Sequence, residues 1–248
     1  MKKLLLLSSA FCLLAIASIG QSRKDTLDQK NLVKVNLSSL ALRNFSFQYE
    51  RKVASRLSVA LGVSLMPEGN IPFKDQISNF ADDPEVTKRL DEFQTGSFAI
   101  TPELRWYISR KGAPRGFYLA PFARYAKYTA KLPQFDIENT SKSIDLGGDI
   151  QAFTGGLLLG SQWRLSKLVY LDLWLLGPNY GSSNGNISGK PNTPFTPQER
   201  QELEEQLEDL EVPLADTEVT VTSTSANMKI SGPWGGLRGL GFNLAFRF

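Results

Sequence analysis

The chain has 248 residues, 28 basic and 25 acidic side chains, one cysteine and no histidine. Its mean hydropathy of -0.20 excludes a bundle of membrane-spanning helices. Because histidine is the commonest general base and metal ligand, its absence argues against an enzyme and against a metal or other cofactor. The near balance of charges, without a concentrated basic face, predicts no nucleic-acid partner.

The N-terminus has the pattern of a cleaved signal peptide. Two lysines precede an apolar stretch from Leu4 to Ile19, and Ser18-Ile19-Gly20 fits a small–x–small cleavage site. The single cysteine, Cys12, lies inside this stretch, so we expect no thiol or disulfide chemistry in the mature chain. We therefore predict that residues 1–20 are removed and that residues 21–248 form a single domain, since single barrels of this length are common.

Apolar side chains alternate with small or polar ones in eight stretches of the mature chain. In the last stretch, 240–248, leucine or phenylalanine occupies every even position, whereas glycine, asparagine, alanine and arginine occupy the odd positions from Gly239 to Arg247. Nine residues of this pattern match a tilted strand that crosses a membrane. The same period of two is found in seven earlier stretches, which begin at Val33, Phe45, Leu57, Phe98, Phe117, Leu157 and Leu171.

The connections between these stretches alternate in length. Short turns at one end and long loops at the other are typical of bacterial outer-membrane barrels. The pattern therefore predicts an all-β fold, an eight-stranded antiparallel up-and-down transmembrane β-barrel, in the bacterial outer membrane with both termini in the periplasm. The expected short links lie near 54–56, 110–116 and 166–168, the long ones at 67–95, 133–148 and 177–228, and the first link, Arg43-Asn44, is brief.

Alternation alone also fits a secreted soluble barrel that turns its apolar face inward and binds a small apolar ligand. The signal peptide and the unequal loops favour the membrane version, in which outer-membrane lipid surrounds the barrel. Aromatic residues of the kind found at membrane interfaces also favour the membrane version, namely Tyr49, Trp106, Phe117, Trp163 and Phe248.

In the membrane version, the polar face of each strand points into the lumen. Acidic and basic residues both occur on this face and can pair, and eight strands leave a lumen that side chains can fill. We therefore expect a filled lumen and a structural or surface-interaction role, with a narrow transport pore as the alternative. The expected lumenal charges are Lys34, Glu50, Glu103, Arg105, Arg124, Arg164, Asp172 and Arg247.

Helical segments are predicted in two of the outer loops. Thr196 is placed to cap a helix that has Pro197 at its first position and Glu199 completing a capping box. A second, weaker helix is predicted from Asp83-Pro84. We expect these helices to pack over the barrel rim, and the alternative is a surface that binds a protein partner or a divalent cation.

The last strand also carries an expected targeting function. Its outward aromatic and aliphatic positions, ending at the carboxy-terminal residue, are expected to be recognised by the barrel-assembly machinery. This expected signal consists of Phe242, Leu244, Phe246 and Phe248.

Seven short segments along the mature chain carry a resemblance to a known family. They are NLVKVNLSSL at 31–40, FQYER at 47–51, LSVALGV at 57–63, TPELRWY at 101–107, GFYLAP at 116–121, LDLW at 171–174 and SGPW at 231–234. In this order they resemble the uncharacterised small outer-membrane β-barrel proteins of diderm bacteria, a family of unknown function. The resemblance implies a barrel fold and an outer-membrane location, but it implies no activity, ligand or site.

Overall fold

A computed structural model describes residues 29–74, 77, 92–136, 142–208 and 215–248. The predicted signal peptide (1–20) and the predicted helix at Asp83-Pro84 lie outside the described residues. No helix within the described part of the chain is long and apolar enough to cross a membrane.

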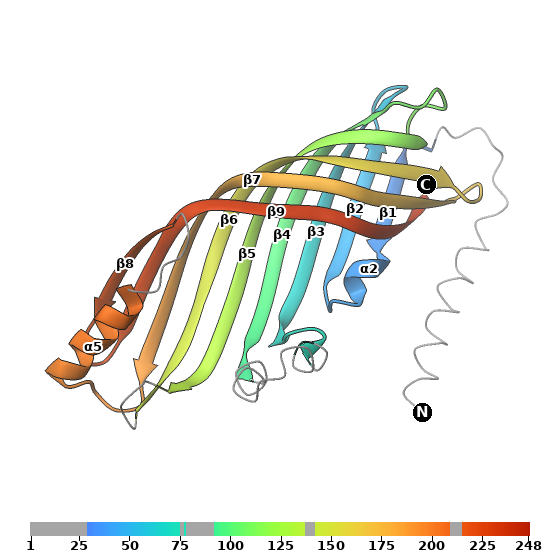
Figure 1. Ribbon diagram of the computed structural model, residues 1–248. Coiled ribbons are helices and arrows are strands. Elements are labelled where there is room, and N and C mark those ends of the chain that lie inside the picture. Colours follow the sequence, from blue (N-terminus) through green and yellow to red (C-terminus); the bar gives the residue numbers. More distant parts are fainter. Residues whose placement is uncertain (1–28, 75–76, 78–91, 137–141, 209–214) are drawn as a thin grey trace, which may run out of the picture.

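The described residues form one antiparallel sheet that closes on itself (Figure 1). Each of the first six strands pairs with the next along the chain, β7 pairs with β9, and β9 returns to pair with β1, so that eight strands complete the ring. This confirms the predicted eight-stranded barrel, while β8 is an additional short strand attached to β9. The strands are β1 (Asn31–Asn36), β2 (Phe45–Lys52), β3 (Leu57–Asn70), β4 (Gln94–Tyr107), β5 (Gly116–Asp136), β6 (Ser143–Arg164), β7 (Val169–Pro191), β8 (Asp216–Val221) and β9 (Ala226–Arg247), and the helices are α2 (Leu37–Leu40) and α5 (Pro197–Glu208).

Side chains alternate between the two faces of the barrel wall, as the period of two predicts. In β3, Ser58 and Ala60 are buried inside the barrel, whereas Val59 and Leu61 are 42% and 48% exposed on the outside. The interior is therefore the polar face and the exterior is the apolar face, which is the reverse of a soluble barrel.

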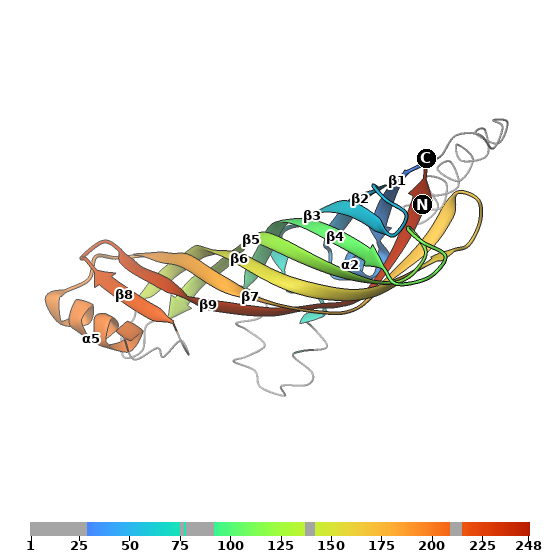
Figure 2. The same ribbon diagram turned by 90° about the horizontal axis from the view of Figure 1, so that it is seen from above.

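The strands differ greatly in length. β3 and β4 have 14 residues each, whereas β5, β6, β7 and β9 have 21 to 23. The long strands continue past the ends of β3 and β4 and carry β8 and α5 at their far end, and we call this part the sheet extension (Figures 1 and 2). The expected long loops at 133–148 and 177–228 are consequently wrong in their bounds. The backbone remains paired there although the alternation of apolar side chains has faded, for example between Asn184 and Gln151.

In two strands, the set of alternate residues that points into the lumen changes part of the way along the strand. Leu175 and Leu176 of β7 are consecutive and both exposed, and Leu240 of β9 has a φ of 51° and is also exposed. The interruption moves Arg238 to the lumenal face and Gly239 to the outer face.

The first connection is longer than the brief link expected at Arg43-Asn44. β1 ends at Asn36, whose side-chain oxygen accepts a hydrogen bond from the Ser39 backbone N–H at 2.9 Å. This cap starts the one-turn helix α2 at Leu37, so the chain from Leu37 onward belongs to the connection and not to β1.

The capping box of α5 is confirmed. The Thr196 backbone N–H donates to Glu199 Oε2 at 2.7 Å, and the Glu199 N–H donates to Thr196 Oγ1 at 3.3 Å. Leu203 of this helix is buried against Phe195 and Ile144. The helix thereby packs onto the sheet extension, at a distance from the barrel itself (Figure 1).

Candidate functional site in the barrel lumen

Buried charges converge inside the barrel near the short turns. Lys34 Nζ lies 2.5 Å from Glu50 Oε2 and 2.6 Å from Asp172 Oδ2, and all three side chains are fully buried. They come from β1, β2 and β7, so the barrel closure itself brings them together.

Arg105 lies at the centre of this group. Its Nη1 is 2.7 Å from Asp172 Oδ2 and 3.2 Å from Glu50 Oε2, and its Nη2 is 2.9 Å from Glu103 Oε2. Arg238 reaches Glu103 from the other side, with Nη1 at 2.5 Å from Oε1. The six residues Lys34, Glu50, Glu103, Arg105, Asp172 and Arg238 form what we call the charge cluster.

Neutral side chains complete the hydrogen bonding of the charge cluster. The Tyr107 hydroxyl donates to Glu50 Oε1 at 2.7 Å, and the Tyr118 hydroxyl donates to Asp172 Oδ1 at 2.8 Å. Gln48 Nε2 donates to Glu103 Oε1 at 2.8 Å, and Lys34 Nζ donates to Gln162 Oε1 at 2.7 Å. Buried carboxylates need such donors, because desolvation otherwise outweighs the attraction between the charges.

The charge cluster is electrically neutral and fills its part of the lumen. Three cations (Lys34, Arg105, Arg238) face three carboxylates, and the largest side chains, Arg105, Tyr107 and Tyr118, have 0% exposure. Tyr107 and Tyr118 also contact each other, with ring centroids 5.3 Å apart. The arrangement can hold the wall strands together, and Arg238 is the one cluster residue with a partly exposed side chain, at 11%.

Five of the eight expected lumenal charges, Lys34, Glu50, Glu103, Arg105 and Asp172, therefore meet in one cluster. The other three lie apart from it. Arg124 lies in the lumen further from the short turns, where its Nη1 donates to Thr101 Oγ1 at 3.1 Å. Arg164 is exposed beside the short turn after β6, with Nε donating to the Ser166 carbonyl. Arg247 lies at the barrel end, 2.9 Å from the Tyr170 hydroxyl.

Sequence reasoning did not identify Arg238 or the neutral donors. Tyr107, Tyr118 and Gln48 lie on faces that the alternation had placed inward, but nothing in the pattern marks them as partners of carboxylates. Arg238 reaches the lumen only because of the change of face near Leu240, and a non-glycine residue with positive φ has no clear sequence signal there.

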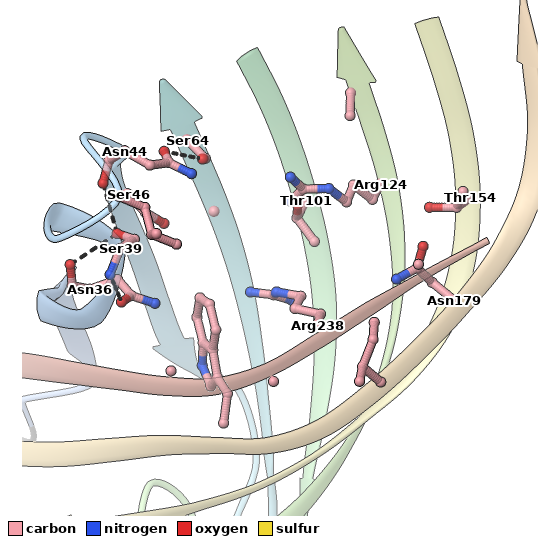
Figure 3. A pocket seen from close by; sticks show the side chains of 18 of the residues that line it. Asn36, Ser39, Asn44, Ser46, Ser64, Thr101, Arg124, Thr154, Asn179 and Arg238 are labelled. Atoms are coloured by element: carbon pink, nitrogen blue, oxygen red, sulfur yellow. Dashed lines mark hydrogen bonds between the residues drawn. The ribbon is translucent and has the colours of Figure 1, made fainter. Parts of the chain in front are cut away.

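On the side of the charge cluster that lies away from the short turns, the lumen is hollow. A cavity of about 430 Å³, which we call the lumenal cavity, is bounded by small or polar residues such as Gly62, Ser64 and Thr154 (Figure 3). Arg238, a member of the charge cluster, also lines this cavity, and its guanidinium lies 3.9 Å from the centroid of the Trp174 ring. Figure 3 shows Arg124 from β5 and Arg238 from β9 pointing into this space.

The donor set of the lumen does not resemble a metal centre. Within the described ranges, no group of three or more His, Cys, Asp or Glu residues could hold a metal ion. Glu50 and Asp172 approach the same Lys34 and Arg105, and these cations occupy the position that a metal ion would need.

Residues 9–180 match the family described as "Protein of unknown function (DUF3575)". This match covers more than half of the chain, so the protein belongs to that family, in agreement with the resemblance to a barrel family of unknown function. No curated protein matches the sequence.

Two solved structures can be superposed on this chain. CarO from Acinetobacter baumannii is 10% identical, covers 86% of this chain and 100% of its own length, and gives a TM-score of 0.35. The translocator domain of the autotransporter NalP from Neisseria meningitidis is 8% identical, covers 100% of this chain and 97% of its own length, and gives a TM-score of 0.31. These values are too low to indicate a shared function, so the functional argument below depends on this chain alone.

Proposed function

We propose that this protein is an integral outer-membrane barrel that does not conduct ions and serves a structural or surface-interaction role without catalysis. The observation that carries the proposal is the reversed polarity of the barrel, with buried charges inside and exposed apolar side chains outside. A soluble barrel with an apolar ligand in its lumen would need the opposite arrangement.

The apolar exterior is continuous around the barrel. Exposed contiguous apolar surfaces of soluble proteins seldom exceed a few hundred Å², so a band this extensive indicates contact with lipid. Outward residues exposed by 37% to 54% include Phe45, Phe47, Val59, Leu61, Val63, Leu65, Phe98, Ile100, Leu104, Trp106, Phe117, Leu157, Trp163, Phe242 and Phe246.

The barrel ends support an orientation in the membrane. Asn31 at the start of β1 and Phe248 at the end of the chain exchange backbone hydrogen bonds, at the end where the short turns lie. Short turns and both termini face the periplasm in outer-membrane barrels, so we infer that the sheet extension lies outside the cell. Tyr49, Trp106, Phe117, Trp163 and Phe248 are all at least 40% exposed and suit the periplasmic membrane interface.

The charge cluster supports the absence of a conducting path. Ions cross a lumen only where water or mobile charge gives them a route, and here Arg105 contacts three carboxylates from three strands. We therefore favour a filled lumen that does not conduct ions over the alternative of a narrow transport pore.

The sheet extension supports the surface-interaction role. About 9–11 residues suffice for a tilted strand to cross a membrane, so strands of 21 to 23 residues leave about half of their length beyond it. This projecting part is ordered by α5, where Lys142 Nζ lies 2.7 Å from Glu199 Oε2. It offers a preformed surface for another protein at the cell surface.

The C-terminal residues suit recognition by the barrel-assembly machinery. Phe242 and Phe246 face outward, while the backbone around Leu244 pairs with β1 and β7 at once. The strand that closes the barrel is thus the one that carries the expected signal.

Adjacent residues of β3 give a sharp test of membrane insertion. Leu61 faces outward, whereas Gly62 faces the lumenal cavity and has room for a Cβ, with its nearest contact at 3.6 Å. We expect the wild-type protein and Gly62→Asp to stay with the outer-membrane fraction after alkaline carbonate extraction, and Leu61→Asp to be lost from it. Release of the wild type by carbonate, or tolerance of Leu61→Asp, would refute the proposal.

A further inference from the structure

The lumenal cavity has an unusual balance of charge. Two arginines, Arg124 and Arg238, line it, and no Asp or Glu is among the described residues that do so. The remaining polar lining consists of hydroxyl and amide groups, including Asn179, Thr154 and Ser64. The space is therefore positively charged and rich in hydrogen-bond donors.

Arg124 differs from the other lumenal cations. Lys34, Arg105 and Arg238 each lie within 4 Å of a carboxylate. Within the part of the chain that the structure describes, the polar partners of Arg124 are neutral, namely the hydroxyls of Thr101 and Tyr128. Because the charge cluster is already neutral, Arg124 supplies one uncompensated positive charge to the lumenal cavity.

A second cation and an unused donor lie at the base of the same cavity. Arg238 donates one hydrogen bond, from Nη1 to Glu103, and its guanidinium is held in place by the Trp174 ring. The Trp174 indole N–H is buried and has no hydrogen-bond partner among the described residues, although the side chain lines the cavity. Buried donors of this kind normally find an acceptor.

We propose that the lumenal cavity binds a small soluble anion that carries a phosphate or carboxylate group. Arg124 makes the principal contact, Arg238 faces the same space, and the neutral hydroxyls and amides bond to other polar groups of the ligand. A volume of about 430 Å³ accommodates a small organic molecule. The anion comes from solution, because the barrel wall separates the cavity from the lipid headgroups outside.

Glucose 6-phosphate is a suitable probe, since it combines a phosphate with hydroxyl groups, and glucose and inorganic phosphate are its separate parts. The full-length protein in detergent micelles is titrated at constant ionic strength while tryptophan fluorescence is recorded. Trp174 and Trp234 line the cavity, so their emission reports on an occupant. We expect saturable binding of glucose 6-phosphate, weaker binding of inorganic phosphate and none of glucose.

Variants distinguish a specific binding site in the lumenal cavity from nonspecific electrostatic attraction of anions to the protein. Arg124→Gln is expected to weaken binding by about 10-fold, the usual effect of losing one charge-assisted hydrogen bond. Arg164→Gln removes an equal charge from the exposed turn outside the cavity and is expected to leave the affinity unchanged. Gly62→Leu is expected to abolish binding by filling the cavity, whereas Gly62→Ala, whose Cβ makes only ordinary contacts, retains it.

The opposite results would overturn the proposal. It is refuted if glucose 6-phosphate shows no saturation up to about 10 mM, an affinity too weak for a specific site. It is equally refuted if Arg164→Gln weakens binding as much as Arg124→Gln does, or if Gly62→Leu binds like the wild type. Because Gly62→Leu changes no charge, it tests the location of the site even if Arg124→Gln fails to fold.

Discussion

The two halves of the lumen share the same barrel wall and differ in what fills it. Near the short turns, large side chains (Arg105, Tyr107, Tyr118) meet at the centre and are completely buried. Further along the same strands the inward positions hold small residues, such as Gly62, Ala126 and Thr154, and a cavity of about 430 Å³ remains. The size of inward side chains therefore decides whether an eight-stranded barrel is closed or hollow at a given level.

The halves also differ in their charge. In the charge cluster each cation has a carboxylate within 4 Å, whereas the lumenal cavity contains Arg124 without an acidic partner among the described residues. A paired cluster with fully buried carboxylates is suited to holding strands together. An unpaired cation in an accessible space is suited to binding a ligand.

Two arginine substitutions should give the largest contrast. Arg105→Met leaves three buried carboxylates facing only two cations, so we expect a loss of roughly 3–5 kcal/mol in the free energy of unfolding. Arg124→Met removes a charge whose described partners are neutral, and it should cost less than about 1 kcal/mol. Urea unfolding in lipid vesicles measures both values, and similar losses for the two variants would contradict the distinction between the halves.

Two glycine substitutions test the packing difference. A Cβ added at Gly160 would overlap the Tyr118 hydroxyl and lie 2.8 Å from the Leu173 carbonyl, so Gly160→Ala should destabilise the barrel by about 1–3 kcal/mol. Gly62→Ala meets no atom closer than 3.6 Å and should change stability by less than about 0.5 kcal/mol. The same unfolding measurement applies, and a neutral Gly160→Ala would show that the lumen near the short turns is loosely packed.

Removing a single hydroxyl gives a smaller effect in the same direction. Tyr118→Phe takes away the donor that lies 2.8 Å from Asp172 Oδ1, which we expect to cost about 1–2 kcal/mol. Tyr128→Phe, in the lumenal cavity, should have little effect because water replaces the lost hydroxyl. Equal costs in thermal or urea unfolding would indicate that both tyrosines have the same environment.

The smallest expected effect lies in the sheet extension. The hydrogen bond from Lys142, together with the Thr196 N–H, lowers the pKa of Glu199 from 4.5 to about 2. Because the pKa is lower in the folded protein, the stabilising contact is fully present above pH 4.5 and is lost as the pH falls through 2. Hydrogen exchange of the first turn of α5 should be faster in Glu199→Gln than in the wild type at pH 5, and the two should converge below pH 2. A difference that is independent of pH would contradict this account.

The sequence was informative where one chemical pattern determines one structural outcome. Alternation of apolar residues identified the eight barrel strands and the correct face for Lys34, Glu50 and Asp172. A shift of the inward-facing positions by one residue would turn all of these charges to the outside of the barrel at once. The Thr196–Glu199 capping box could also be predicted from the sequence, since both of its hydrogen bonds form between residues that are close in sequence.

Other features depend on contacts that no local pattern encodes. The continuation of β7 to Pro191 depends on pairing with β6 and β9, and its polar side chains carry no strand signal of their own. The lumenal position of Arg238 depends on the local backbone at Leu240. The convergence of five predicted charges, and the isolation of Arg124, follow from the register around the closed ring.

Planar-bilayer recording of the purified wild-type barrel tests the central claim most directly, namely that the charge cluster closes the lumen. The buried contacts of Arg105 with Asp172, Glu50 and Glu103 predict a baseline current without reproducible steps at moderate voltage and salt. Regular, uniform conductance steps from the wild-type protein would contradict the account, because they would require an aqueous path through the cluster.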